Sequence, residues 1–439
     1  MMSQPRWIES LLVPLIILGG LLPMILNWWF WGRVPTLAPQ DAIEILNTPD
    51  EEAVLVDVRD TGKFETRHLE VAQNWPLEQI LAISSPSQVP MQLQDKTLLL
   101  ICEAGFSSAE ATRKLQSFGV SKVYNVRGGM QEWISVWEAP CTMPLCRFRP
   151  SSGDQGLSFR ATPIFEQWAG VIAGFGFKPV YMLSSLVLVW ILRHRNSPDL
   201  VALRWALIFF FVGEGCCAVY TLNYLFFRRG SDFFEYLHGY GMVLAFAFTG
   251  YAIIEGLDTR GVKLSNPGKK CAALDLCGPC IKYEDAPCGA RRLFLLLVPL
   301  LIILAAIPLF ATPSTVSYNT FVTGTFYNYS HLVIHQIFET RYCPSLAIGL
   351  FSISFLVLWR KKDRPVTPMA KFLFAAGFGP FGFSMFRLLF TSVYQNNLVW
   401  FDFWEELTEL LYVATIGCVL WIFRRRLFQE DVREISATI

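Results

Sequence analysis

A strand, a cysteine-containing loop and a helix are predicted by Leu98-Leu99-Leu100-Ile101-Cys102-Glu103-Ala104-Gly105-Phe106-Ser107-Ser108. An apolar run of about strand length ends on Cys102, turns through a loop that contains Gly105, and enters a helical pattern from Ser108 to Phe118. Unpaired N–H groups and the positive end of the helix dipole lie at a helix start, so this site favours an anionic sulfur. An inert buried cysteine at a strand end fits the same pattern.

Working outward, the composition indicates a membrane protein with a smaller soluble insert. The chain has 439 residues, of which 53% are hydrophobic and 17% are charged, and it contains 36 Phe and 14 Trp. The net charge is only +1, and the basic residues form short clusters beside apolar runs. Such clusters are a membrane-topology signal, so we expect no nucleic-acid partner.

The region around the quoted stretch has the pattern of a soluble α/β domain. Strands are predicted at Ala53 to Val58, Thr97 to Cys102 and Lys122 to Val126, and helix-like segments lie between them. This alternation favours a parallel sheet covered by helices.

Four motifs in this region make it resemble a rhodanese-like (sulfurtransferase) domain over about residues 40–137. In chain order they are Val54-Leu55-Val56-Asp57-Val58-Arg59-Asp60, then Phe64 with His68, then Asn74-Trp75-Pro76-Leu77, and finally Tyr124-Asn125-Val126-Arg127-Gly128-Gly129-Met130-Gln131-Glu132-Trp133. The second corresponds to the family's Gly-His-Ile segment, and the last corresponds to its closing Gly-Gly-x-x-x-Trp. The resemblance covers less than a quarter of the chain.

The resemblance implies that Cys102 carries sulfane sulfur as a persulfide. The implied site comprises Cys102, Glu103, Ala104, Gly105, Phe106, Ser107, Ser108, Asp57 and Arg59. Where the family loop often reads Cys-x-x-Gly-x-Arg-Ser, this chain has Ser107 at the arginine position, which removes a bidentate partner for an oxyanion. Glu103 further disfavours an anion. We therefore expect sulfur from another persulfide, or mere binding, in preference to thiosulfate chemistry.

About eight transmembrane helices are predicted from apolar runs of roughly 20 residues. The first is an uncleaved anchor at Leu11 to Trp31, and the others lie near 170–192, 201–226, 233–255, 293–312, 331–359, 371–390 and 401–423. The predicted domains are an anchor at 1–34, the rhodanese-like domain at 35–146, a linker at 147–169, a seven-helix membrane domain at 170–430 with a cysteine-rich loop at 260–292, and a tail at 431–439.

The basic clusters predict the orientation in the membrane. They follow the second, sixth and eighth spans and lie between the fourth and fifth, whereas the loops 312–330 and 391–397 carry no basic residue. The positive-inside rule then places both termini in the cytoplasm and the rhodanese-like domain outside. We expect an integral protein of a bacterial inner membrane with a periplasmic rhodanese-like domain.

The predicted cytoplasmic loop contains Cys271, Cys277, Cys280 and Cys288. Four thiolates suit zinc or an iron–sulfur cluster, and the pair in Cys277-Gly278-Pro279-Cys280 also suits dithiol redox or sulfur-relay chemistry. Plain reduced cysteines are the remaining interpretation.

A polar pocket is predicted inside the spans, because ionisable groups there usually line a cavity or pair with each other. Its candidate residues are Glu214, His238, His331, His335, Glu339, Arg387, Glu405 and Glu409. His331, His335 and Glu339 have the spacing of one helix face. The expected occupants are a haem, a metal, or an anion near Arg387, and the alternative is interhelical hydrogen bonding.

The leading interpretation is a membrane-bound rhodanese-like protein that carries sulfane sulfur as a persulfide on Cys102. Such a protein is a sulfurtransferase if Cys102 is reactive. It implies a sulfane-sulfur donor, either a small molecule or a persulfide protein, and a cytoplasmic acceptor of sulfur or electrons. The alternatives are a transporter of a sulfur anion, a membrane redox protein with a cysteine-bound cluster and a haem or metal, and a non-catalytic sensor.

Overall fold

The computed structural model describes residues 33–49, 51–130, 148–150, 163–227, 232–259, 288–311, 316–322, 325–331, 336–360, 366–394 and 398–425, with a few isolated positions besides. The parts of the structure reported below lie within these ranges and positions. They form an α/β domain and a helical region that follows it.

The α/β domain contains a parallel sheet of five strands in the order β1-β6-β5-β2-β4. These strands are β1 (Thr36–Leu37), β2 (Ala53–Asp57), β4 (Gln73–Asn74), β5 (Thr97–Ile101) and β6 (Val123–Val126). Helices of the domain within the described residues include α2 (Pro39–Asn47), α3 (Thr61–Thr66), α4 (Leu77–Ala82) and α5 (Phe106–Ser117). A short strand, β3 (Arg67–Leu69), pairs in the antiparallel sense with β7 (Phe148–Pro150). The predicted parallel sheet covered by helices is confirmed.

The central strand β5 is buried along its whole length because both faces of the sheet are covered. Side chains alternate along a strand, so Leu98 and Leu100 pack into the cluster that contains Leu115 of α5. Leu99 belongs to the opposite cluster, with residues of α2 and with the buried Trp133. The carboxyl end of this buried strand therefore holds the residue that follows it, Cys102, in a fixed position.

The helical region begins with a nearly continuous helix made of α7 (Ile164–Val171), the π-helical segment η5 (Ile172–Phe177) and α8 (Lys178–Leu192). It continues with α9 (Pro198–Phe227), α10 (Asp232–Thr259), α13 (Cys288–Ala306) and the 3₁₀ segment η6 (Ile307–Phe310). A hairpin of β8 (Val316–Val322) and β9 (Thr325–His331) follows. The π-helical segment η7 (Phe338–Tyr342), α15 (Cys343–Arg360), α16 (Val366–Tyr394) and α17 (Leu398–Ile422) complete the described helices.

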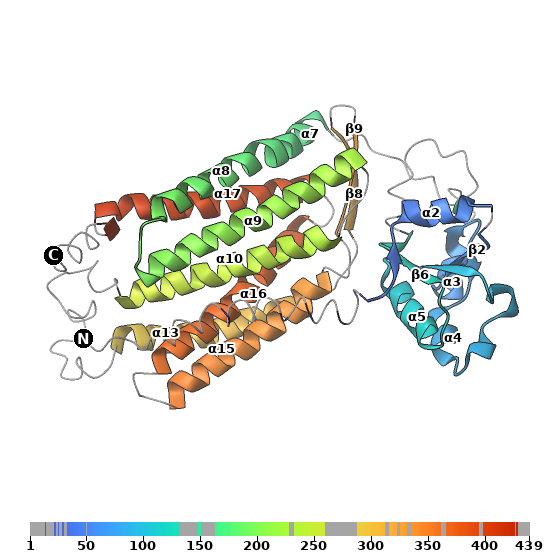
Figure 1. Cartoon of the computed structure of the whole chain (residues 1–439), viewed down its shortest axis with the longest axis horizontal. Coiled ribbons are helices and arrows are strands. Elements are labelled where there is room, and N and C mark those ends of the chain that lie inside the picture. Colours follow the sequence, from blue (N-terminus) through green and yellow to red (C-terminus); the bar gives the residue numbers. More distant parts are fainter. Residues whose placement is uncertain are drawn as a thin grey trace.

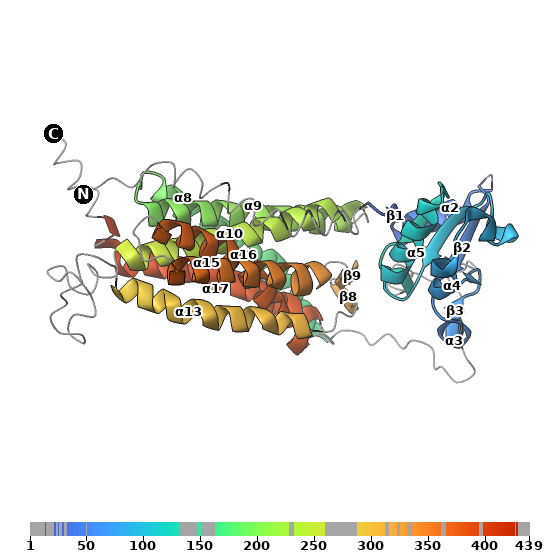
Figure 2. The same ribbon diagram turned by 90° about the horizontal axis from the view of Figure 1, so that it is seen from below.

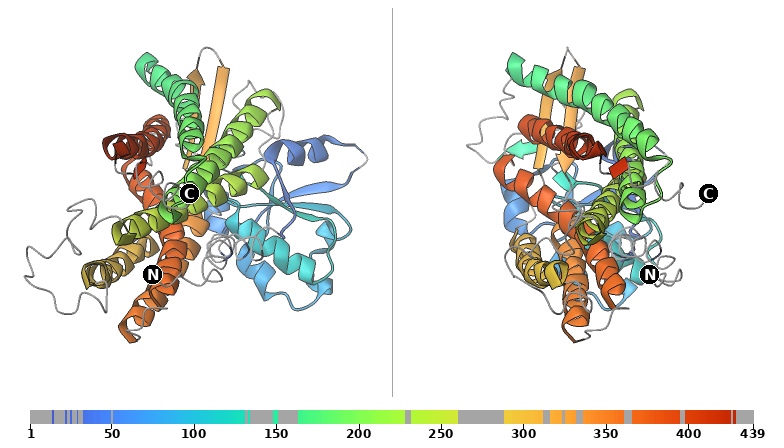
Figure 3. Two further views of the ribbon diagram at one scale, coloured as in Figure 1. Left: turned by 60° about the vertical axis from the view of Figure 1, so that its left-hand side comes forward. Right: turned by 90° about the vertical axis from the view of Figure 1, so that its left-hand side faces the viewer.

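The long helices run side by side, and the α/β domain lies at the end of this bundle where β8 and β9 are found (Figures 1 and 2). Figure 3 looks more nearly along the bundle, with α8 and α17 toward one side and α13 and α15 toward the other. Packing between α9 and α10, and between α10 and α16, connects the two sides.

Five helices in the described residues are long and apolar enough to cross a membrane. They cover Ile164–Leu192, Pro198–Tyr220, Phe233–Leu257, Phe338–Trp359 and Met369–Phe386. They correspond to five of the eight predicted spans and fit a membrane protein. The predicted span at 293–312 is a shorter apolar helix, Leu295–Phe310, and α17 carries four acidic residues in its first half. The predicted span at Leu11 to Trp31 lies almost entirely outside the described residues.

One predicted span has the wrong start. The run 331–359 was expected to be helical throughout, but His331 ends strand β9, and the helix described after it includes η7 and α15. The aromatic and hydroxyl residues of β9, Thr325-Phe326-Tyr327-Asn328-Tyr329-Ser330-His331, favour a strand when the complementary strand β8 is available for pairing.

Candidate functional site

The Cys102 thiol lies at the start of α5, directly after β5. Its Sγ accepts a hydrogen bond from the backbone N–H of Gly105 at 3.1 Å and lies 3.2 Å from the donating Ser108 Oγ. Gly105 has the left-handed conformation (φ 81°) that turns its N–H toward the sulfur. The N–H donors at a helix start and the Ser108 hydroxyl stabilise a negative charge on this atom.

The Ser108 hydroxyl is shared between two acceptors. Its Oγ also lies 2.7 Å from Asn125 Oδ1 on β6, and both side chains are buried. A hydroxyl carries one proton, so donation to Cys102 Sγ competes with donation to Asn125. An anionic sulfur is the stronger acceptor and attracts this proton.

The closing Gly-Gly motif holds the other side of the thiol loop. The Met130 N–H donates to the Cys102 carbonyl oxygen at 2.7 Å. Gly129 has a φ of +60°, and a Cβ at this position would clash with that carbonyl oxygen and lie 2.7 Å from the Ala104 nitrogen. Only glycine allows the two backbones to approach this closely.

Arg59 connects the Asp-x-Arg motif to the thiol loop. Its guanidinium forms an ion pair with the fully buried Asp57 at 2.8 Å and another with Glu103 at 2.9 Å, and it donates to the Arg67 carbonyl oxygen at 2.5 Å. Burial lowers the pKa of Arg59, but the hydrogen bonds and charges of Asp57 and Glu103 outweigh that effect, so its pKa lies above the ordinary value. Arg59 therefore stays charged.

The pairing with Arg59 changes the expected role of Glu103. Its side chain is 55% exposed and points to the guanidinium, which offsets its negative charge beside the thiol. Ala104, Phe106 and Ser107 complete the loop and first turn of α5, all partly exposed. With Ser107 in this turn, the loop presents no arginine of its own to an anionic donor.

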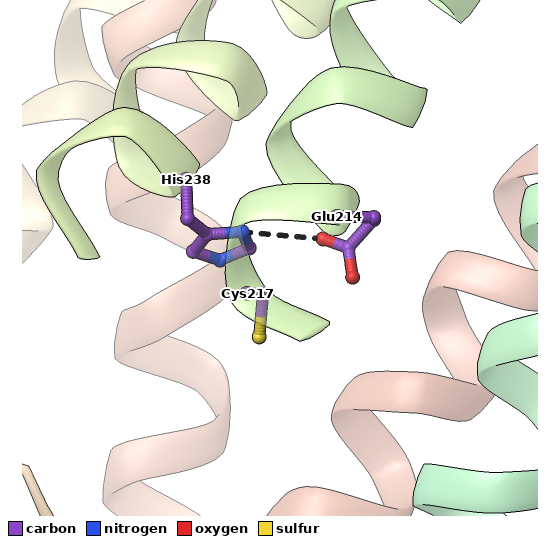
Figure 4. Close-up of side chains that lie close together, drawn as sticks. All are labelled: Glu214, Cys217 and His238. Atoms are coloured by element: carbon purple, nitrogen blue, oxygen red, sulfur yellow. Dashed lines mark ion pairs between the residues drawn. The ribbon is translucent and has the colours of Figure 1, made fainter. Parts of the chain in front are cut away.

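The structure brings together three of the residues predicted for the membrane pocket. Glu214 of α9, His238 of α10 and Glu409 of α17 are all buried. His238 Nδ1 is 3.3 Å from Glu214 Oε1, and the two side chains point toward each other (Figure 4). The carboxylate oxygens of Glu214, Glu406 and Glu409 lie within 4.8 Å of one another.

The other predicted pocket residues are distributed differently. Glu405 is on α17 and half-buried, and Glu339 is on η7, where its backbone oxygen accepts a hydrogen bond from Ser384 Oγ on α16 at 2.5 Å. The prediction that His331 and Glu339 share a helix face is wrong, since His331 lies in β9. His335 and the side chain of Arg387 lie outside the described part of the structure.

The predicted cysteine cluster is not described in the structure. Cys271, Cys277 and Cys280 lie outside the described residues, and Cys288 is the first residue of α13, with its side chain undescribed. The zinc or iron–sulfur prediction for this loop stays a prediction.

Sequence reasoning missed two members of the buried cluster, Lys178 and Tyr181, whereas Glu406 stands among the acidic residues that the sequence groups with Glu405 and Glu409. Lys178 Nζ lies 2.6 Å from Glu214 Oε2 and 2.9 Å from Glu406 Oε1. The signal that could have found Lys178 is a lone lysine inside an apolar run of membrane-span length, because such a charge needs an anionic partner.

Two sets of side chains in the cluster have donor atoms suited to a metal: Glu214 with Cys217 and His238, and Glu214 with Glu406 and Glu409. In the second set the Lys178 ammonium already contacts two of the carboxylates. That set is therefore better described as an ion-pair network than as a metal centre.

Comparison with known proteins supports the assignment of the α/β domain. The family model for the rhodanese-like domain matches residues 38–135, and no family model matches the helical remainder. The thiosulfate sulfurtransferase GlpE of Pseudomonas syringae pv. syringae is 34% identical over 88 residues, which are 20% of this chain and 78% of that protein.

Two further relatives match over a similar length of the chain. The uncharacterized protein slr1261 of Synechocystis is 32% identical over 98 residues, which are 22% of this chain and 51% of that protein. The probable adenylyltransferase/sulfurtransferase MoeZ of Mycobacterium tuberculosis is 30% identical over 108 residues, 25% of this chain and 26% of that protein. This chain therefore spans about half of slr1261 and a quarter of MoeZ. Through residues 38–135, the chain belongs to the rhodanese-like family.

Proposed function

We propose that this chain is a membrane-bound rhodanese-like protein that carries sulfane sulfur as a persulfide on Cys102. The observation that carries the proposal is the position of Cys102 Sγ, which is buried at the start of α5 and lies 3.1 Å from the Gly105 nitrogen and 3.2 Å from Ser108 Oγ. These two donors stabilise the thiolate before transfer and the terminal sulfur anion after it.

The transfer is a thiol–persulfide exchange. The Cys102 thiolate attacks the outer, sulfane sulfur of the donor, a new S–S bond forms on Cys102, and the S–S bond of the donor breaks. The donor leaves as a thiolate and takes up a proton from solvent. No net oxidation or reduction occurs, and the reverse exchange delivers the sulfur to an acceptor thiol.

The loop favours a thiol persulfide as the donor. An arginine at position 107 would bind two oxygens of an oxyanion such as thiosulfate, and Ser107 offers no such fork. Arg59 contacts Glu103 and the buried Asp57 instead, so its guanidinium is engaged away from an incoming anion. A thiol persulfide carries a single anionic sulfur and no oxyanion, so it does not need a bidentate arginine.

The proposed location is a bacterial inner membrane with the rhodanese-like domain outside. Support comes from the placement of the loops: the β8–β9 hairpin, in a region without basic residues, lies at the end of the bundle that carries the α/β domain (Figure 1). The connection from α8 to α9, which carries Arg193 and Arg195, lies at the opposite end.

The test compares two donors on the full chain in detergent, a small-molecule thiol persulfide and thiosulfate, each carrying radiolabelled sulfane sulfur. We expect label from the persulfide on the wild-type protein, little from thiosulfate, and none on the Cys102→Ala variant at that position. Ser107→Arg should raise labelling by thiosulfate, and Ser87→Arg, which adds the same charge on exposed η2 (Pro86–Gln88), should not. Absence of label on Cys102 from both donors would contradict the proposal.

A further inference from the structure

A buried network of charged and hydroxyl groups connects four helices of the bundle, separate from the Cys102 site. Lys178 and Tyr181 come from α8, Glu214 from α9, and Glu406 from α17. His238 of α10 lies beside Glu214, 3.3 Å from its Oε1 (Figure 4). Ionisable groups are costly in a membrane-spanning bundle, so their retention here calls for a functional explanation.

The network contains one more short oxygen contact than its hydroxyl proton can explain. Tyr181 Oη lies 2.6 Å from Glu214 Oε2 and also 2.6 Å from Glu406 Oε2. Each contact of this length between two oxygens needs a proton between them. The phenol carries one proton, so it donates to one carboxylate, and the second contact requires a proton on the other carboxyl group.

We propose that Glu406 holds this proton and that the network is a proton-binding site of the membrane bundle. Glu214 is the better compensated carboxylate, because Lys178 Nζ lies 2.6 Å from its Oε2 and His238 lies beside its Oε1. Glu409 lies within 4.8 Å of both carboxylates, but Glu406 has no histidine contact of this kind among the described residues and also experiences the charge of Asp402. Repulsion from these neighbours favours the neutral form of Glu406.

This assignment satisfies every donor of the central groups. The three N–H groups of Lys178 serve Glu214 Oε2 at 2.6 Å, Glu406 Oε1 at 2.9 Å and Tyr181 Oη at 2.9 Å. Tyr181 donates to Glu214 and accepts from the Glu406 hydroxyl. With both carboxylates ionised, the contact between Tyr181 and Glu406 would place two oxygens together without a hydrogen.

Two buried oxygens beside this centre can receive the proton when it moves. Glu409 Oε2 has no hydrogen-bond partner within the described part of the chain, and Glu214 Oε1 makes only the longer 3.3 Å contact with His238 Nδ1 there. A buried carboxylate oxygen left in this condition is costly, and protonation relieves that cost. The titratable groups around Glu406 are Lys178, Tyr181, Glu214, Cys217, His238, Asp402, Glu405 and Glu409.

The backbone is adapted to hold these side chains at close range. The π-helical segment η5 ends directly before Lys178, and such segments change the direction in which the next side chains point. Gly213 and Gly241 let α9 and α10 approach closely, since a Cβ at Gly241 would lie 2.6 Å from Gly213 Cα. This contact is adjacent to Glu214 and near His238 in sequence.

The test is infrared spectroscopy of the full chain in detergent at neutral pH, before and after hydrogen–deuterium exchange. The wild-type protein should show the carbonyl band of buried protonated carboxylic acid, and one group's share of its intensity should belong to Glu406. Glu406→Gln should remove that share and retain the fold, because glutamine mimics the neutral acid. Glu255→Gln is the matched control: Glu255 is also buried, and it pairs with Lys371 at 2.9 Å in a separate ion pair. It should leave the band unchanged.

Tyr181→Phe gives a second readout that does not remove a carboxyl group. It should keep the carboxylic acid band but shift its frequency, because the Glu406 hydroxyl loses its acceptor. The proposal is overturned if the wild-type protein has no such band, or if the band survives Glu406→Gln unchanged. A stoichiometric metal ion that is lost in Glu406→Gln would also overturn it, since the cluster would then be a metal site.

Discussion

Replacing Ser108 by alanine tests whether the α5 hydroxyl stabilises the Cys102 thiolate. The substitution removes the Oγ that lies 3.2 Å from Cys102 Sγ and leaves the Gly105 N–H at 3.1 Å in place. A hydrogen bond to a charged group contributes about 1.5–3 kcal/mol. Because the hydroxyl proton is shared with Asn125, we take the lower end of this range, which corresponds to about a tenfold loss of thiolate reactivity.

The assay is the rate of alkylation of Cys102 at neutral pH in the full chain. Trypsin cleaves after Lys96 and Arg113, and the resulting peptide 97–113 contains Cys102 as its single cysteine. Its alkylated fraction can therefore be measured by mass spectrometry despite the 11 cysteines of the chain. Alkylation of the unfolded protein, at the same pH, corrects for differences between the variants in digestion and detection.

Ser107→Ala is the matched control, since it removes a hydroxyl from the adjacent residue of the same helix turn. We expect its rate to stay near that of the wild-type protein. The reasoning is refuted if Ser108→Ala alkylates at the wild-type rate, or if Ser107→Ala slows alkylation as much as Ser108→Ala does.

Three further predictions concern stability. Arg59→Ala leaves Asp57 buried without its cation and should destabilise the α/β domain by about 3–5 kcal/mol, measured by urea-dependent proteolysis. The control is Lys63→Ala, which removes an exposed ion pair and should change the stability by less than about 1 kcal/mol. The pKa of Asp60 is lowered because its carboxylate accepts a hydrogen bond from the Lys63 N–H at the start of α3. This cap is therefore fully present above the ordinary aspartate pKa and is lost as the pH falls through the lowered value. Amide exchange at Lys63 should become faster over that fall in pH, and Asp60→Ala should abolish the dependence. Lys178→Met removes the cation from the buried network and should lower the thermal unfolding midpoint in detergent far more than Lys178→Arg does.

The α/β domain was predictable because its information is local. The apolar run before Cys102 and the motif that ends at Trp133 specify a strand and a closing turn without knowledge of any distant contact. The three predicted strands match β2, β5 and β6 to within one residue at each end. The predicted start of α5 is two residues late, since Phe106 and Ser107 already belong to the helix.

The side-chain partners were less predictable because they depend on packing between distant segments. Nothing in the chain order pairs Glu103 with Arg59, which precedes it by 44 residues. Tyr181 and Glu406 are 225 residues apart and meet only because α8 packs against α17. The four-residue spacing that suggested a helix face at His331 was overridden by strand pairing in the β8–β9 hairpin.

The most direct test of the central claim is the mass of peptide 97–113. The full chain is first exposed to a small-molecule thiol persulfide, and the persulfides formed on the protein are then trapped by alkylation. The account predicts that this peptide gains the mass of one sulfur atom on Cys102, and that dithiothreitol removes it. A peptide that stays unmodified, while peptides with other cysteines of the same sample gain sulfur, would contradict the claim.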